Sequence, residues 1–187
     1  KREGKASDSE ILVARLIDRA LRPLFPDDFH AEVFVTVNLI SAEKDIQPDA
    51  IAGLAASAAI AVSDIPFNGP IAGVYVGRVD GKYVVNPSVE EMERSDIELA
   101  VAGTKDAINM VEAGSKEVSE EDMLGAIMFG HEKIKELIAF QEEIVKEVGK
   151  EKRHIELYEI DAMLKEEVES KAKDRLISAV RIHEKLE

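Results

Sequence analysis

The sequence contains no cysteine and no tryptophan among its 187 residues, and aromatic residues make up only 5% of the chain. The absence of cysteine excludes a disulfide framework, a thiolate metal site and a cysteine nucleophile, and it fits a reducing compartment. No stretch approaches the roughly 18 consecutive apolar residues that a membrane-spanning helix requires, and no signal segment opens the chain. With 45% hydrophobic and 33% charged residues, the composition is typical of a globular protein.

Positive charge is also scarce, with 24 Lys and Arg residues against 38 Asp and Glu and a net charge of −14. Because phosphate binding depends on Lys and Arg, nucleic-acid contact requires a local basic patch. Residues 1–22 are the exception, with six basic and four acidic side chains. The remaining residues therefore carry a net charge of −16, which leaves an acidic protein-interaction module as one hypothesis.

A helix is predicted from Ser7 to about Arg22. Ser7 and Glu10 have the spacing of a capping box, in which each side chain accepts a hydrogen bond from the other residue's backbone N–H. Pro23 ends the helical run because a proline disfavours helical backbone in the residue before it. The chain opens on Lys-Arg-Glu-Gly without an initiator methionine, so we expect a piece of a longer protein.

Three arginines at i, i+4 and i+7 form a stripe along this helix, and three more cations precede it in a glycine-containing loop: Arg15, Arg19, Arg22, Lys1, Arg2 and Lys5. Guanidinium groups bind phosphate in bidentate geometry and stack on bases, so such a patch can guide a single nucleic-acid strand. The alternative is structural. Asp18 has the spacing to pair with Arg22 and Arg15, and Arg19 can anchor the fold through an ion pair.

Periodicity and turn residues predict strands and helices in separate groups, which favours an α+β fold. Strands are predicted at residues 33–39, 74–79, 83–85, 97–102 and 107–112, and helices at 49–62 and 119–148. An Asp-Gly turn at Asp80 predicts a hairpin of the strands at 74–79 and 83–85, and a second hairpin is predicted between 97–102 and 107–112. The charged linker at 149–153 is the predicted boundary between domains at 1–149 and 150–187, and the second is too short to bury a core of its own.

Several chemical motifs are absent or ambiguous. The chain has no Gly-x-x-x-x-Gly-Lys-Ser/Thr loop, and the glycines at 69, 73 and 77 do not lie between a strand and a helix, as the dinucleotide fingerprint requires. The four histidines fall in different predicted elements and indicate no metal site. One acidic cluster has the hard oxygen ligands that Mg2+ prefers, but a solvated loop entering a strand also explains it: Glu90, Glu91, Glu93, Asp96 and Glu98.

Five blocks of the chain resemble bacterial polynucleotide phosphorylases, and they occur in the same order. They are residues 1–4 (KREG), 14–26 (ARLIDRALRPLFP), 65–71 (IPFNGPI), 101–104 (VAGT) and 125–132 (GAIMFGHE). The tail from about residue 154 resembles the helical segment that joins the two core domains of this family.

The resemblance implies that this chain is the first of the family's two ribonuclease PH-like core domains (ribosomal S5 domain 2-like). That domain lacks its N-terminal strands here and is followed by the start of an all-α linker domain. It also implies a cytoplasmic homotrimeric ring that acts in mRNA degradation from the 3′ end. Inorganic phosphate is then the attacking group, Mg2+ the cofactor and nucleoside diphosphates the products of a reversible reaction. Single-stranded RNA and other RNA-degradation proteins are the implied partners, with no membrane contact.

The family places its catalytic acids and a lysine in the second core domain, in an Asp-x-Asp-x-Lys-Val-Ala-Gly-like stretch. Residues 96–103 of this chain keep the acids in part, but Ala100 stands where the lysine would be. We therefore expect this segment to be a non-catalytic ring scaffold and RNA guide, with no catalytic residue or metal ligand and with Mg2+ bound outside it. The family's basic loop and arginine-bearing helix imply RNA contacts at Lys1, Arg2, Lys5, Arg19 and Arg22. An autonomous non-catalytic RNA-binding subunit of an exosome-like ring is the alternative.

Overall fold

The computed structural model describes residues 4–156 and 159–184. The chain divides into two compact units, Lys1–Pro26 with Glu32–His154, and Asp27–Ala31 with Ile155–Glu187. The boundary between residues 149 and 150 stays a prediction about the domains of the family.

The first unit combines one antiparallel sheet with helices, so the predicted α+β class is confirmed. Its elements are α1 (Asp8–Leu21), the 3-10 turn η1 (Arg22–Leu24), α2 (Asp49–Val62), β1 (Ala72–Val79), β2 (Lys82–Val85), α3 (Val89–Arg94), β3 (Ile97–Gly103), β4 (Ile108–Ser115) and α4 (Glu120–Val148). The second unit contains α5 (Ala162–Ala179). No helix of the described residues has the length and apolar character needed to cross a bilayer.

The sheet has the strand order β2-β1-β3-β4, with every neighbouring pair antiparallel. Both predicted hairpins are present, β1 with β2 and β3 with β4. At the first turn, Asp80 and Gly81 have φ values of 51° and 75°. Two successive positive φ angles are what a tight two-residue hairpin requires, and Asp-Gly tolerates them.

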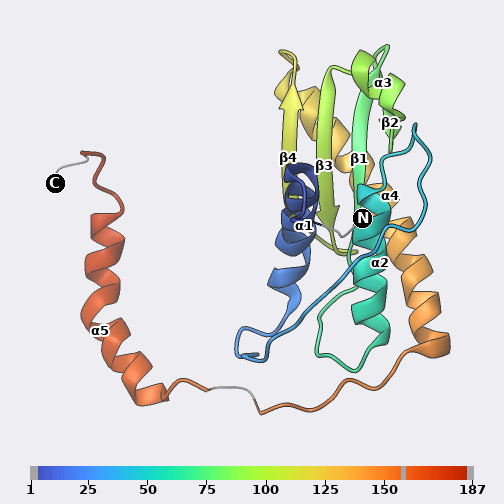
Figure 1. The fold of residues 1–187 in the computed structure, drawn as a ribbon. Helices are drawn as coiled ribbons and strands as arrows, with labels where there is room; N and C mark the ends of the chain where they lie inside the picture. Colours follow the sequence, from blue (N-terminus) through green and yellow to red (C-terminus); the bar gives the residue numbers. More distant parts are fainter. Residues whose placement is uncertain (1–3, 157–158, 185–187) are drawn as a thin grey trace. The chain divides into compact units, whose positions relative to one another are not determined.

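Helices cover both faces of the sheet, with α1 and α2 on one face and α4 on the other (Figure 1). The α4 face is built from large β-branched and aliphatic side chains, among them Val76, Leu99 and Val101, which pack against Ile134 and Ile138. On the opposite face, β3 contributes the small residues Ala100 and Ala102. There Ala102 of β3 and Met110 of β4 pack with buried residues of α1 and α2.

Segment 33–39 is not a strand, so that prediction is wrong. Its backbone is assigned to no helix or strand, and the large side chains Phe34 and, just beyond the segment, Ile40 are 85% and 96% exposed. Alternation of apolar and polar residues favours extended backbone, but a strand also needs a partner to satisfy its N–H and C=O groups. Within the described residues, no strand pairs with this segment.

The short helix α3 was not predicted. Ser88 caps it by accepting a bond from the backbone N–H of Glu91, and the Glu91 carboxylate accepts one from the backbone N–H of Ser88. Glu90, Glu91 and Glu93 therefore lie on a six-residue helix rather than on a loop that enters a strand. The pattern Ser-x-x-Glu at residues 88–91 is a capping box, so the sequence carries a local signal for this helix.

The chain beyond α4 returns to the end of α2. The Nζ atom of Lys152 donates hydrogen bonds to the carbonyl oxygens of Ile60, Ala61 and Ser63 at 3.0, 2.9 and 2.7 Å. These oxygens lie at the C-terminal end of a helix, where backbone acceptors lack intrahelical donors and a cation is favourable. Partial burial lowers the pKa of Lys152. Residues 150–153 thus belong to the packing of the first unit.

Candidate nucleic-acid interface

Helix α1 displays the predicted basic stripe, and its start is firmly defined. The Ser7 Oγ atom accepts from the backbone N–H of Glu10 at 3.3 Å, and Glu10 Oε2 accepts from the backbone N–H of Ser7 at 2.6 Å. The hydrogen bonds that the backbone N–H and then the hydroxyl of Ser7 donate to the Glu10 carboxylate lower the pKa of Glu10. The predicted capping box is confirmed, and it sets where the helical register of the arginines begins.

Arg22, the residue directly after α1, is paired with Asp18 of α1. Its Nε and Nη2 atoms donate to the two carboxylate oxygens of Asp18 at 3.1 and 2.7 Å. The Arg22 side chain is nevertheless 75% exposed. The fork-to-fork geometry is the one a guanidinium also uses to bind a phosphate group.

Arg19 is paired across the fold. Its Nη1 atom donates to Oε2 of Glu112 on β4, and the Arg19 side chain is 46% exposed. Close by, Asn109 Nδ2 donates to the carbonyl oxygen of Ala20 at 2.9 Å. Two contacts therefore tie α1 to β4, which agrees with the structural alternative for Arg19, although the ion pair lies at the surface.

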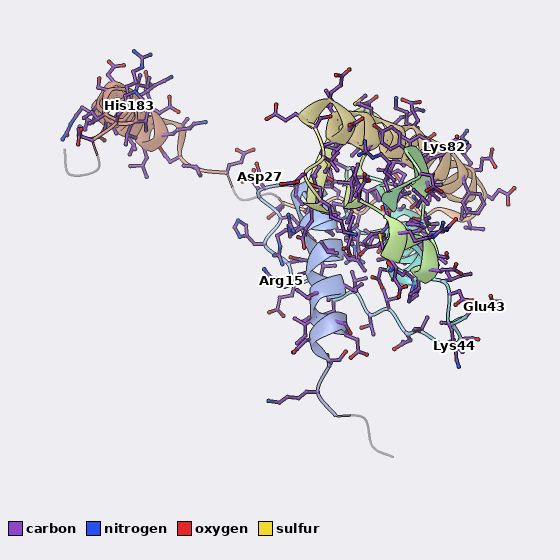
Figure 2. All side chains as sticks on the ribbon, turned by 90° about the horizontal axis from the view of Figure 1, so that it is seen from above. Arg15, Asp27, Glu43, Lys44, Lys82 and His183 are labelled. Carbon is purple, nitrogen blue, oxygen red and sulfur yellow. The ribbon has the colours of Figure 1, made fainter. Side chains whose placement is uncertain are left out.

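Arg15 differs from its two neighbours, because it makes no ion pair or side-chain hydrogen bond with the described part of the chain. Figure 2 shows it on α1, on the side away from the bulk of the sheet. The pairing of Arg15 with Asp18 that the spacing allowed is thus not formed. Lys5 is exposed in the segment before α1, whereas Lys1 and Arg2 lie outside the described residues.

The acidic segment does not assemble a cation site. Both Asp96 carboxylate oxygens accept from Arg78, at 2.9 Å from Nε and 2.7 Å from Nη2, and Arg78 also pairs with Asp122 on α4 at 2.8 Å. The hydrogen bonds from Arg78 lower the pKa of Asp96. Among the described residues, no group of three or more His, Cys, Asp or Glu side chains is placed to hold a metal. The acidic side chains of this segment, Asp96 among them, are therefore not arranged as a Mg2+ site.

A small apolar cavity lies at Ala100, the position where the family would have its lysine. Its volume is about 50 Å³, and Ile17, Gly53 and Tyr75 are among the residues that line it. The Tyr75 hydroxyl donates to Asp49 Oδ2 at 3.3 Å. Burial, followed by the charge of Asp49, raises the pKa of Tyr75 to about 12. The phenol is therefore neutral, and no cation lines the cavity.

Sequence reasoning missed two residues that shape this interface, Glu112 and Asn109. Each contacts α1 from about 90 positions away in the chain. Neither has a local signal, because only the packing of β4 beside α1 brings them together. Asp18, in contrast, could be found from its i+4 spacing to Arg22.

Comparisons with known proteins place these features in a family. A profile described as 3′ exoribonuclease family, domain 1, matches residues 1–66, and one described as domain 2 of the same family matches residues 69–133. The chain is 61% identical over 185 residues to polyribonucleotide nucleotidyltransferase of Bacillus velezensis and 60% identical to that of Bacillus licheniformis. Each alignment covers 99% of this chain and 26% of the relative, so the chain spans about a quarter of their length.

A solved structure supports the fold. The crystal structure of rice (Oryza sativa) Rrp46 matches with a TM-score of 0.58 at 14% sequence identity, covering 76% of this chain and 68% of that one. At this identity the likeness concerns the arrangement of helices and strands alone. It agrees with the ribonuclease PH-like core expected from the sequence.

Proposed function

This chain belongs to the 3′ exoribonuclease family, and from that premise we propose that it is the RNA-guiding, non-catalytic core domain of a phosphorolytic enzyme. The parent protein then shortens RNA from the 3′ end with inorganic phosphate, releases nucleoside diphosphates and acts in mRNA degradation in the cytoplasm. The observation that carries the proposal is the exposed arginine stripe of α1. It presents cations to a polyanion in a chain whose net charge is strongly negative.

The proposed contacts are Lys5, Arg22 and the preceding Lys1 and Arg2. Arg19 is a further proposed contact, and while no RNA is bound its pairing with Glu112 positions α1. Contacts of this kind follow the backbone of a single strand and carry little sequence preference. RNA is therefore held by charge and led toward a reaction centre built elsewhere in the parent protein.

The chemistry is proposed to lie outside this chain. Phosphoryl transfer requires cations that neutralise charge on the transferred group, but Ala100 and the apolar cavity beside it supply none. Asp96 is already neutralised by Arg78. We place the Mg2+ site in another domain of the parent protein, and we expect a homotrimer in which this domain forms part of a ring with other RNA-degradation proteins as partners.

The RNA-guiding role can be tested in the full-length protein with the double variant Lys5→Glu, Arg22→Glu. We expect the Kd for a labelled oligoadenylate to rise about tenfold or more, because each reversal replaces an attraction to phosphate by a repulsion. The double variant Lys82→Glu, Arg94→Glu, which reverses two exposed charges on β2 and α3, is the matched control and should change the Kd by less than about twofold. If both double variants changed the Kd by the same factor, or if neither changed it, the proposal would be contradicted.

The non-catalytic role has its own test. Glu98→Gln removes the acid that aligns with the family's catalytic motif while leaving the Asp96–Arg78 pair intact. We expect phosphorolysis by the full-length protein to keep its kcat. Loss of activity with unchanged RNA binding would show that this segment takes part in the chemistry.

A further inference from the structure

The three arginines of α1 belong to one stripe but differ in their partners. Arg22 is bound by Asp18 and Arg19 by Glu112, whereas Arg15 has no ion pair within the described residues. Two of the three cations are therefore already neutralised when no nucleic acid is present. The sequence alone suggested a stripe of equivalent positive charges.

Both carboxylates accept hydrogen bonds from arginine N–H groups that a phosphate oxygen also accepts from. In the Asp18 pair, two guanidinium nitrogens face two oxygens at 3.1 and 2.7 Å. Carboxylate and phosphate share this bidentate geometry with arginine. An RNA phosphate that uses these same N–H groups of either arginine has to displace the carboxylate that holds them.

The two pairs are exposed enough to be displaced. The arginine side chains are 75% and 46% exposed, and ion pairs in water contribute only a small net free energy. Arg78 is a useful contrast, because its side chain is 17% exposed and it holds both Asp96 and Asp122. That arginine belongs to the framework, whereas those of α1 face solvent.

We propose that Asp18 and Glu112 act as built-in competitors of RNA phosphate, which hold Arg22 and Arg19 in place and limit the affinity of the interface. This inference rests on the proposed RNA-guiding function of α1. Each carboxylate keeps its arginine extended along the helix surface and gives way when a phosphate arrives. When an RNA strand advances past the interface, each arginine then exchanges a phosphate oxygen for a carboxylate oxygen and is not left without a partner.

The exchange has a signature in the salt dependence of binding. When RNA binds, the cations that had neutralised its phosphates are released into solution, so the affinity falls as the salt concentration rises. In the wild-type protein a displaced carboxylate takes up a cation again, and this uptake offsets part of the release. Without the carboxylate there is no offset, so binding should become both tighter and more sensitive to salt.

The test uses Asp18→Asn and Glu112→Gln in the full-length protein, with fluorescent oligoadenylate titrated at several salt concentrations. Each substitution should tighten binding about two- to fivefold and steepen the plot of log K against log salt. Asp8→Asn is the matched control, because Asp8 lies on the same helix and makes no ion pair with the described residues. It removes the same charge and should leave the salt slope unchanged.

The outcomes separate this inference from the proposed function. If Asp8→Asn tightens binding as much as Asp18→Asn, the effect is that of net charge and the inference is overturned. If neither Asp18→Asn nor Glu112→Gln tightens binding while Lys5→Glu, Arg22→Glu weakens it, the inference fails and the RNA-guiding function stands. If that double variant also binds RNA normally, the proposed function itself is wrong. Thermal unfolding of Asp18→Asn controls for loosening of α1, since Asp18 lies in this helix and its partner Arg22 caps it.

Discussion

The two faces of the sheet are packed by different means. On the α4 face, large aliphatic side chains interlock, and Ile134 and Ile138 are almost completely buried. On the α1 and α2 face, small residues such as Ala100 and Ala102 leave a cavity of about 50 Å³, and surface ion pairs tie α1 to its surroundings. One face is specified by close packing, while the other has spare volume and exposed charge.

This difference assigns separate tasks to the two faces. A densely packed interior resists any change of volume, because each added or removed methylene group disturbs several neighbours. The α4 face therefore fixes the sheet. The looser face carries the arginines, whose contacts with solvent and with carboxylates can change at small cost. Substitutions at equivalent positions on the two faces should have opposite effects.

The largest expected effect is that of Gly130→Ala in the middle of α4. A Cβ atom there would lie 2.7 Å from Val101 Cγ1 and 3.0 Å from Val76 Cγ2. Both partners are stiff β-branched residues in a packed core, so α4 must shift away from the sheet. We expect the free energy of unfolding to fall by about 1–3 kcal/mol despite the better helix propensity of alanine. Hydrogen exchange of the β1 and β3 amides measures the change.

The counterpart on the other face is Gly53→Ala in α2. The added Cβ atom would lie 3.8 Å from Ile17 Cγ1, an ordinary contact, at the edge of the cavity. Alanine also loses less backbone conformational entropy than glycine when the helix forms, so we expect the free energy of unfolding to rise by up to about 1 kcal/mol. The same exchange measurement applies. If both glycine substitutions changed stability in the same direction, the contrast between the faces would be wrong.

Much of this fold could be predicted from local signals. The capping boxes at Ser7 and Ser88, the Asp-Gly turn at Asp80 and the apolar stripe of α4 act over a few residues, and the elements that they define follow from backbone and capping chemistry. Segment 33–39 shows where this reasoning ends. Its alternation predicts extended backbone, but pairing depends on a neighbour that the segment itself cannot specify.

The candidate interface was predictable only in part. The arginine stripe and its pairing with Asp18 follow from helical spacing, which is a local property. Glu112 and Asn109 could not be identified in this way, because their contacts with α1 depend on how β4 packs beside it. The charge of each arginine is thus readable from the sequence, whereas its partner is a product of the tertiary fold.

The smallest expected effect concerns the acid stability of the α4 face, where Arg78 joins β1 to Asp96 and Asp122. Hydrogen bonds lower the pKa of both carboxyls. For Asp96 the main cause is hydrogen bonding from Arg78, and for Asp122 it is hydrogen bonding from Ser119, followed by that from Arg78. A carboxyl whose folded-state pKa is depressed adds stability above its unfolded pKa of about 3.9 and loses it as the pH falls through the folded value. In Arg78→Met the pKa of Asp96 should return toward its ordinary value. The variant should therefore be less stable near neutral pH and lose less stability than the wild type between about pH 5 and pH 2.

Arg94→Met is the control, since Arg94 lies 4.0 Å from its nearest carboxylate, that of Asp80, at the surface. Parallel pH profiles for the wild type and Arg78→Met would show that the ion pairs of this face do not contribute to its stability. Close packing alone would then distinguish it from the face that carries the arginines.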